Sequence, residues 1–385
     1  MEIYLDNCAT TKPREAVIEE MVQVLREEYG NPSSLHRMGF NIEKRIENTR
    51  ETIGKFLKVN KDEIYFTSGG TESNNLAIQS IINKYHRKGK HIITTGIEHP
   101  SVLNVLKYYE QRGYEITYLK VDKKGLISLE EFKSSIRKDT ILVCIMLVNN
   151  EVGSIQPIGE IREILQEEGS NALLHVDGIQ AFGKIPVDIK GWDIDTFSFS
   201  GHKIYGPKGI GGLYINKKVK LEPIIFGGNQ EKGLRSGTEN VPGIIGLGKA
   251  VEIMGKNYEK EREWVKKIKS YFIDKLKENM DLIRINSPVD KTCSPYILNV
   301  SFKYVRGEVL LHYLEDKGIY VSTGSACSSK GTEKSHVLQE MGLSSLDIDG
   351  AIRFCFSYEN TIEDIDYTIN VLKNSVEEIR KITMR

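Results

Sequence analysis

The stretch that decides the fold is "ILVCIMLV", residues 141–148, in which every position is apolar. A strand of this kind is buried on both faces, as in a parallel sheet that helices cover on each side. From about residue 60 to residue 215, strand-like and helix-like segments alternate around it. The alternation predicts an α/β fold with a doubly wound, mostly parallel sheet.

The expected elements follow from hydrophobic periodicity. Strands of the core are predicted over 62–68, 91–96, 115–121, 140–148, 172–178 and 194–201, and helices over 72–88, 101–113, 128–136 and 158–169. Beyond residue 255 the pattern changes to a long charged helix and a smaller α+β set: 258–280, 282–287, 294–302, 307–318 and 361–382. We therefore expect a large α/β domain over 14–255 and a small α+β domain made of 1–13 and 256–385.

Composition and charge exclude several classes of protein. Lysine plus arginine and aspartate plus glutamate both number 53, a balance that disfavours nucleic acid or a membrane surface as a partner. The first residues, "MEIYLDNCAT", carry no basic apolar leader, and no apolar run reaches the roughly 20 residues of a membrane span, so a cytoplasmic protein is expected. The five cysteines contain no C-x-x-C pair and the eight histidines show no metal-ligand spacing, so neither a disulfide framework nor a metal site is predicted.

Polar residues follow the predicted strands at their carboxyl ends, where open α/β sheets gather functional groups. In "GGTESNN", Gly70 and Thr71 lie where a helix starts, so free N–H groups and a hydroxyl can bind a phosphate there. The alternative is an ordinary helix cap at Thr71. His99 and Asn150 follow two further strands, and each residue type is also common in purely structural roles.

The last two strands of the core deliver a carboxylate and an amine. Asp177 and Gln180 follow one of them, and Ser200, His202 and Lys203 follow the other. An ion at a buried strand end costs free energy unless it is paired or used in chemistry, so a simple salt bridge is one reading. Taken together, the strand ends indicate pyridoxal phosphate, whose aldehyde takes a lysine and whose ring nitrogen takes a carboxylate. The tail "GPKGIGG" matches neither G-x-x-x-x-G-K-[ST] nor G-x-G-x-x-G at a helix start, which disfavours a nucleotide site.

Two further residues stand out in the second half of the chain. Cys327 lies among small polar residues in "STGSACSSKG", an environment expected of an accessible nucleophile rather than of a buried thiol, although an incidental loop cysteine is the alternative. Arg353, in the apolar "AIRFCFS", suggests a bidentate carboxylate partner, which is either an amino-acid substrate or a structural acid.

These residues together resemble the cysteine desulfurases, within the class V aminotransferase-like group of fold-type I pyridoxal phosphate enzymes. The resemblance runs nearly end to end, through "YLDNCATT", "FTSGGTESNN", "EHPSVL", "VNNEVGSIQPI", "HVDGIQ", "SFSGHKIYGPKGIGGLY", "RSGTEN" and "STGSACSS". The cysteine motif resembles that of the group with a long cysteine loop, which serves housekeeping iron–sulfur assembly. Gly70 and Gly178 depart from the pattern, because many relatives have alanine there.

The resemblance implies a role for each matching residue. Lys203 would be the Schiff-base lysine, Asp177 the partner of the pyridine nitrogen and His99 the residue that stacks on the ring. The other implied cofactor contacts are Gln180 at the ring hydroxyl and, at the phosphate, Gly70, Thr71, Ser200, His202 and Thr238, the last from the second subunit of a homodimer. Asn150 and Arg353 would bind the substrate carboxylate, and Cys327 would take up sulfur.

The implied reaction removes sulfur from L-cysteine, giving L-alanine and a persulfide on Cys327. Lys203 would take the α-proton and His99 would move further protons. The sulfur would pass to an acceptor protein such as an iron–sulfur scaffold. Alternatives are a selenocysteine lyase or a class V aminotransferase and, in another class, a sulfur carrier on an inactive fold.

Overall fold

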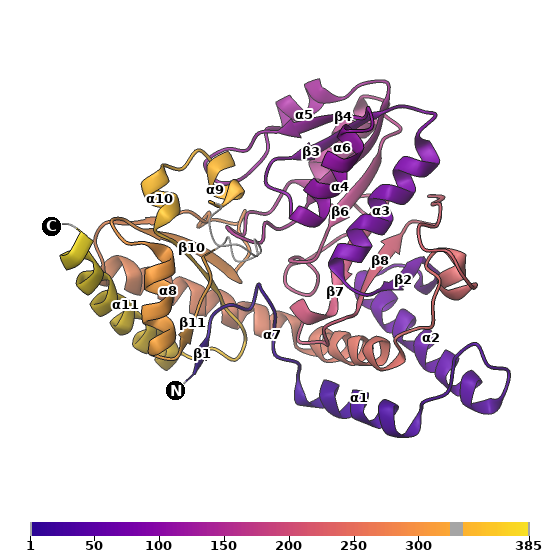
Figure 1. Ribbon diagram of the computed structural model, residues 1–385, viewed down its shortest axis with the longest axis horizontal. Coiled ribbons are helices and arrows are strands. Elements are labelled where there is room, and N and C mark those ends of the chain that lie inside the picture. The colour runs from indigo at the N-terminus through magenta and orange to yellow at the C-terminus, as the bar shows by residue number, and fades with distance from the viewer. Residues whose placement is uncertain (1, 324–333, 384–385) are drawn as a thin grey trace.

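The computed structural model describes residues 2–323 and 334–383. Most of the chain is arranged around two sheets, a large one and a small one, with helices packed on both (Figure 1). The large sheet has the strand order β2-β8-β7-β6-β5-β3-β4. These strands are β2 (Ile64–Thr67), β8 (Gly211–Ile215), β7 (Thr196–Ser200), β6 (Leu173–Asp177), β5 (Thr140–Met146), β3 (His91–Thr95) and β4 (Glu115–Leu119).

The expected α/β class and mostly parallel sheet are confirmed. All strands from β7 to β4 in that order run parallel, and only β8 is antiparallel to its two neighbours. The sequence did not single out β8 as a strand. It follows β7 after the connection 201–210, which contains only a short 3₁₀ helix, so the two strands pair antiparallel without a crossover α-helix.

Helices cover both faces of this sheet, as the apolar run 141–148 predicts. Alternate residues of β5 point to opposite sides: Leu142 and Cys144 pack with α3 (Gly70–Tyr85) and α4 (Pro100–Glu110). Val143 and Ile145 belong to the core on the other face, with α5 (Leu129–Ser135) and α6 (Ile158–Glu167). Burial on both faces explains why the run 141–148 contains no polar position.

The small sheet has the order β12-β10-β9 and is antiparallel. Its strands are β9 (Ile283–Ile285), β10 (Ile297–Phe302) and β12 (Ala351–Cys355), and its helices are α8 (Gly307–Asp316), α9 (His336–Glu340), α10 (Ser345–Asp349) and α11 (Ile362–Thr383). The N-terminal strand β1 (Ile3–Tyr4) pairs with β11 (Ile319–Tyr320), and Asp6 bridges to Cys355. The first residues therefore lie with the C-terminal part of the chain. The division into two domains stays a prediction.

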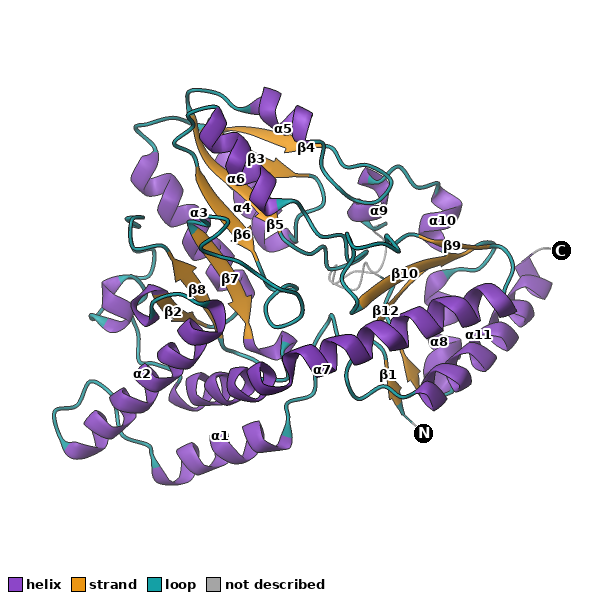
Figure 2. Cartoon of the chain, turned by 180° about the vertical axis from the view of Figure 1, so that it is seen from behind, coloured by secondary structure: helices purple, strands orange, loops and turns teal. Residues whose placement is uncertain are grey.

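One helix, α7 (Val241–Asn279), runs from the large sheet to the small one (Figure 2). It begins well before the predicted 258–280, because Asn240 caps it and the glycines near its start serve packing. A Cβ on Gly246 would lie 2.7 Å from Met21 Cγ, and one on Gly248 would lie 2.7 Å from Thr49 Oγ1. These glycines let α1 (Glu15–Glu27) and α2 (Arg37–Leu57) approach closely, at a cost in helix propensity that hides the helix from sequence patterns. No helix in the described ranges is long and apolar enough to cross a membrane.

Candidate active site

A cavity of about 310 Å³ opens at the carboxyl ends of β5, β6 and β7. It is lined by Cys8, Ala9, Gly70, Thr71, His99, Met146, Val148, Asn150, Asp177, Ile179, Gln180, Ser200, His202, Lys203 and Arg353. Every residue predicted for the site is among them except Thr238 and Cys327. Thr238 is exposed on the stretch before α7, and Cys327 lies outside the described residues.

One end of the cavity is built to hold an anion. Helix α3 begins at Gly70, so Thr71 lies within its first turn and is not the cap that the alternative reading required. The Ser200 hydroxyl is buried and has no hydrogen-bond partner within the described chain. Burial, together with Lys203 and other nearby lysines, lowers the pKa of His202 to about 4, so its imidazole is neutral at pH 7. Helix N–H groups, two hydroxyls and an imidazole therefore converge at one place.

The two glycines that depart from the family pattern are matched by larger neighbours. A Cβ on Gly70 would lie 2.2 Å from Ile179 Cδ1, and a Cβ on Gly178 would lie 1.9 Å from Phe197 Cζ. Neither position tolerates alanine without a shift of these side chains. The departures are local packing solutions and leave the functional side chains in place.

Lys203 ends the short 3₁₀ helix Gly201–Lys203 directly after β7. Lys203 is only partly buried, so it loses less hydration than a lysine directly after a buried strand was expected to lose. Its Nζ donates to the carbonyl oxygen of Ala9 at 2.7 Å and also to that of Cys8. The N-terminal segment thus supplies acceptors for this ammonium.

Asp177, at the end of β6, accepts two hydrogen bonds. Asn74 Nδ2 donates to its Oδ2 at 2.8 Å and the backbone N–H of Ile179 donates to its Oδ1 at 3.0 Å. Asn74 is itself fixed, because its Oδ1 accepts from Ser198 Oγ and from His175 Nε2. Burial lowers the pKa of His175 to about 3, so this donor ring stays neutral and its tautomer is set by the network.

His99 is the N-cap of α4, and its orientation defines its tautomer. The backbone N–H of Ser101 donates to its Nδ1 at 3.1 Å, so in the neutral ring the proton is on Nε2. Burial lowers the pKa of His99 despite the neighbouring Asp177 carboxylate, which favours this neutral form. Ser101 also accepts from Asn74, so His99 and Asp177 belong to one hydrogen-bond network.

Gln180 is oriented by a buried lysine that sequence patterns did not indicate. Lys184 Nζ donates to Gln180 Oε1 at 2.9 Å, and Gln180 Nε2 donates to the carbonyl of Cys8 at 3.0 Å. The amide oxygen is therefore committed to Lys184 and one N–H to Cys8, and the second N–H remains for the cavity side. Burial lowers the pKa of Lys184 to about 7, with smaller contributions from Lys203 and Arg353.

Arg353 reaches the cavity from β12 of the small sheet and is buried. Its Nη2 forms an ion pair with Asp6 Oδ1 at 2.8 Å, and its Nη1 donates to the carbonyl of Asn150 at 3.0 Å. The structural ion pair considered from the sequence is therefore present. The Arg353 Nε is buried and has no partner among the described residues, which leaves donor capacity unused.

A disulfide between Cys8 and Cys355 crosses the same region. The sequence led us to expect no disulfide framework. The partners are 347 positions apart with a Cα–Cα distance of 5.6 Å, a pairing that spacing alone does not reveal. The bond ties the segment that supplies acceptors to Lys203 to the strand that carries Arg353.

Sequence reasoning missed five buried polar residues around the site: Asn74, Ser101, His175, Lys184 and Ser198. Only His175 and Ser198 carry a signal in the sequence, because each is a polar residue within a buried strand. His175, for example, interrupts the apolar strand "ALLHV". Such a residue needs a buried partner, but the sequence does not say which one.

Comparisons with known proteins agree with this geometry. The aminotransferase class-V family matches residues 3–368. The chain is similar to the cysteine desulfurase IscS of Dictyoglomus turgidum, with 45% identity over 99% of this chain and 96% of that one. It is also similar to the IscS of Methanosarcina thermophila, with 44% identity over 99% of this chain and 93% of that one.

Solved structures agree as well. A NifS-like protein has 39% identity and a TM-score of 0.93, over 98% of this chain and all of that one. A NifS-like protein from Rickettsia africae has 32% identity and a TM-score of 0.87, over 98% of this chain and 100% of that one.

Proposed function

The chain belongs to the aminotransferase class-V family, and from its site we propose that it is a cysteine desulfurase that takes sulfur from L-cysteine and leaves L-alanine. Pyridoxal phosphate is the cofactor of these enzymes. The observation that carries the proposal is the convergence of Lys203, Asp177 and His99 in one cavity with an anion-binding end. We propose that the sulfur is held as a persulfide on Cys327 and is then passed on for iron–sulfur cluster assembly.

The residues of the cavity fit pyridoxal phosphate. The buried Ser200 hydroxyl has no hydrogen-bond partner among the described residues and lies beside the start of α3, where a phosphate would supply acceptor oxygens. Both oxygens of Asp177 accept hydrogen bonds, the pattern of an ionised carboxylate, which suits a protonated ring nitrogen. When bound, the cofactor supplies a conjugated cationic ring that delocalises the electron pair left at the substrate α-carbon.

The chain's own residues would then divide the work. We assign Lys203 as the cofactor's covalent anchor and as the base that accepts the α-proton. Gly70, Thr71, Ser200 and His202 would hold the phosphate, with Thr238 contributed by the partner in a homodimer. Because Lys184 holds the Gln180 oxygen, Gln180 would present an N–H donor to an oxygen on the ring.

His99 would stack on the ring and act as a proton donor. Its Nδ1 is occupied by the Ser101 N–H, so only Nε2–H is available for proton transfer in the neutral form. Positioned acids and bases of this kind contribute about 10²–10⁴-fold to rate. Asn150 and Arg353 would bind the substrate carboxylate, with the Nε of Arg353, which has no partner in the described part of the chain, as one donor. Sulfur uptake by Cys327 rests on the motif alone.

The experiment compares wild type, Lys203→Ala and Cys327→Ala, each given L-cysteine and a reductant. The proposal requires alanine and sulfide from wild type, neither from Lys203→Ala, and a loss of sulfide release in Cys327→Ala. Transamination that persists in Cys327→Ala without sulfur release would instead favour a class V aminotransferase. If wild type used selenocysteine as readily as cysteine, the result would favour a selenocysteine lyase. Cytoplasmic location, the homodimer and the sulfur acceptor complete the proposal.

A further inference from the structure

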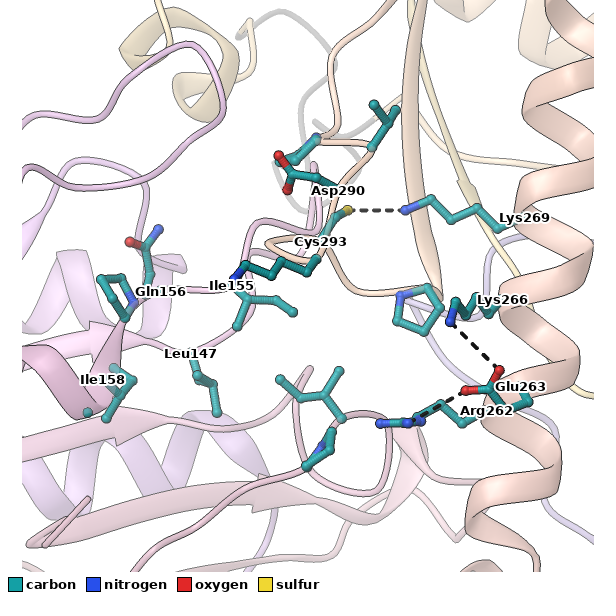
Figure 3. Close-up of a pocket in the computed structure, with 18 of the residues that line it drawn as sticks. Leu147, Ile155, Gln156, Ile158, Arg262, Glu263, Lys266, Lys269, Asp290 and Cys293 are labelled. Carbon is teal, nitrogen blue, oxygen red and sulfur yellow. Dashed lines mark hydrogen bonds and ion pairs between the residues drawn. The ribbon is translucent and has the colours of Figure 1, made fainter. Parts of the chain in front are cut away.

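A second and larger cavity, of about 800 Å³, shares no lining residue with the cavity that holds Lys203 (Figure 3). Helix α7 forms one wall, Leu147 and residues 155–160 form another, and residues of the segment 288–295 also line the cavity. Its volume is within the roughly 300–1,000 Å³ of small-molecule sites. The proposed activity uses none of its polar groups.

The walls of this cavity are mostly apolar. Their apolar members are Leu147, Ile155, Pro157, Ile158, Ile185, Pro186, Trp192, Ile273, Pro288, Val289 and Pro295. Ligand sites typically combine such walls with a few convergent polar groups that fix orientation. The cavity would therefore accept an apolar body and would orient it by whichever polar groups remain unpaired.

Lys269 is the buried charged group among the described residues that line this cavity, with only 7% of the residue exposed. Its Nζ donates to Cys293 Sγ at 3.1 Å and to the carbonyl of Ser294 at 2.9 Å (Figure 3). Within the described ranges, no carboxylate lies within ion-pair distance of it. Burial raises the pKa of the Cys293 thiol more than Lys269 lowers it, so the thiol does not supply a counter-charge.

The other charges around the cavity are paired or exposed. Glu263 is shared by Arg262 at 3.6 Å and Lys266 at 3.8 Å, and Asp290 pairs with Lys124 at 2.7 Å. Glu160 and Lys291 also line the cavity, and both are exposed to solvent. A buried ammonium without a carboxylate is costly, and an anion next to it would offset that cost. Lys269 is thus the position where an anionic head group is best accommodated.

We propose that this cavity binds a small molecule with an apolar body and one anionic head group, and that the head group is held by Lys269. A carboxylic acid with an aliphatic or aromatic body has this chemistry. The ligand would lie between α7 and the segment that follows Asn150, outside the catalytic cavity.

The test titrates the holoenzyme with 8-anilinonaphthalene-1-sulfonate, an apolar anion, and follows its fluorescence. Lys269→Met keeps the length of the side chain but removes the charge, and it should raise the Kd about tenfold or more. Lys266→Met is the matched control, because it removes the same charge from a side chain 70% exposed on the same helix. It should change the Kd by less than about twofold. N-phenyl-1-naphthylamine, the uncharged counterpart, should bind both variants as it binds wild type.

A second measurement does not depend on any variant. Cys293 of wild-type holoenzyme is alkylated with N-ethylmaleimide and quantified by peptide mass spectrometry. Saturating 8-anilinonaphthalene-1-sulfonate should slow this alkylation about fivefold or more, because the thiol lines the occupied cavity. The proposal is overturned if Lys269→Met binds the probe as wild type does, if Lys266→Met has an equal effect, or if Cys293 is not protected. Loss of desulfurase activity has no bearing on these readouts.

Discussion

Asn74 Nδ2 donates a 2.8 Å hydrogen bond to Oδ2 of Asp177, which links helix α3 to the carboxylate at the end of β6. The same amide holds His175, Ser198 and Ser101. Asp177 therefore depends for its orientation on a residue that would not touch the cofactor. Such a network is sensitive to the loss of one member, because several buried groups lose their partner at once.

Asn74→Ala should lower the free energy of unfolding by about 1–3 kcal/mol, because buried donors and acceptors are left unpaired. It should also weaken pyridoxal phosphate binding, since Asp177 loses a fixed donor. Urea unfolding and cofactor titration measure the two effects. Asn75→Ala, next in the chain and only partly buried, should cost less than about 0.5 kcal/mol. Equal effects of the two variants would contradict the network.

Lys184→Met should change how stability depends on pH. Burial lowers the pKa of Lys184 to about 7, whereas in the unfolded chain it titrates near 10.5. Between these values the unfolded state binds more protons, so wild-type stability rises with pH there, and the methionine variant lacks this rise. The stability advantage of Lys184→Met over wild type should shrink by roughly 2–3 kcal/mol from pH 7 to pH 9.

The control for this measurement is Lys190→Met, at an exposed position. It should differ from wild type by less than about 0.5 kcal/mol at each pH. If the difference in unfolding free energy between wild type and Lys184→Met did not change between pH 7 and pH 9, Lys184 would not be a buried, largely neutral lysine. The absorbance of bound cofactor should also shift in Lys184→Met, because Gln180 loses the contact that orients its amide.

Reduction of the Cys8–Cys355 disulfide should lower the free energy of unfolding by about 2–4 kcal/mol, because it opens a very long loop. Urea unfolding with and without reductant measures this. Cys8→Ser should show the lower stability under both conditions, whereas Cys293→Ser should respond to reductant as wild type does. A titration of the unreduced, denatured protein that finds all five thiols reactive would contradict the bond.

Arg353→Lys should raise the KM for L-cysteine about 10-fold or more with a smaller effect on kcat, because lysine cannot serve several acceptors in a fixed plane. Steady-state kinetics measure both constants. Asp6→Asn separates the two readings of this arginine, since it removes the ion-pair partner and keeps the guanidinium. It should leave the KM within about threefold. An equal rise in both variants would mean that Arg353 acts mainly through Asp6.

The sequence predicts those parts of the fold and site that follow from local patterns. The apolar run 141–148 indicates a sheet covered on both faces, and parallel strand ends must meet at one edge, which brings Asp177 and Lys203 together. The resemblance adds roles to these residues. Those roles remain predictions, but the common cavity is an observation.

The remaining features depend on contacts between distant segments. Cys8 and Cys355 pair across 347 positions. Lys184 donates a hydrogen bond to Gln180 in the turn after β6, and no local pattern in the sequence indicates that this lysine is buried. The start of α7 was missed because its glycines read as helix breakers, although they are there to let α1 and α2 pack closely. In each case the deciding partner is set by the tertiary structure.

Helix α7 has a mechanical consequence. Its 39 residues give a rod about 58 Å long that passes without interruption from one sheet to the other. A rod of this kind acts as a strut, so a swing of the small sheet away from the large one would have to bend or break it. Wide hinge opening therefore carries an elastic penalty.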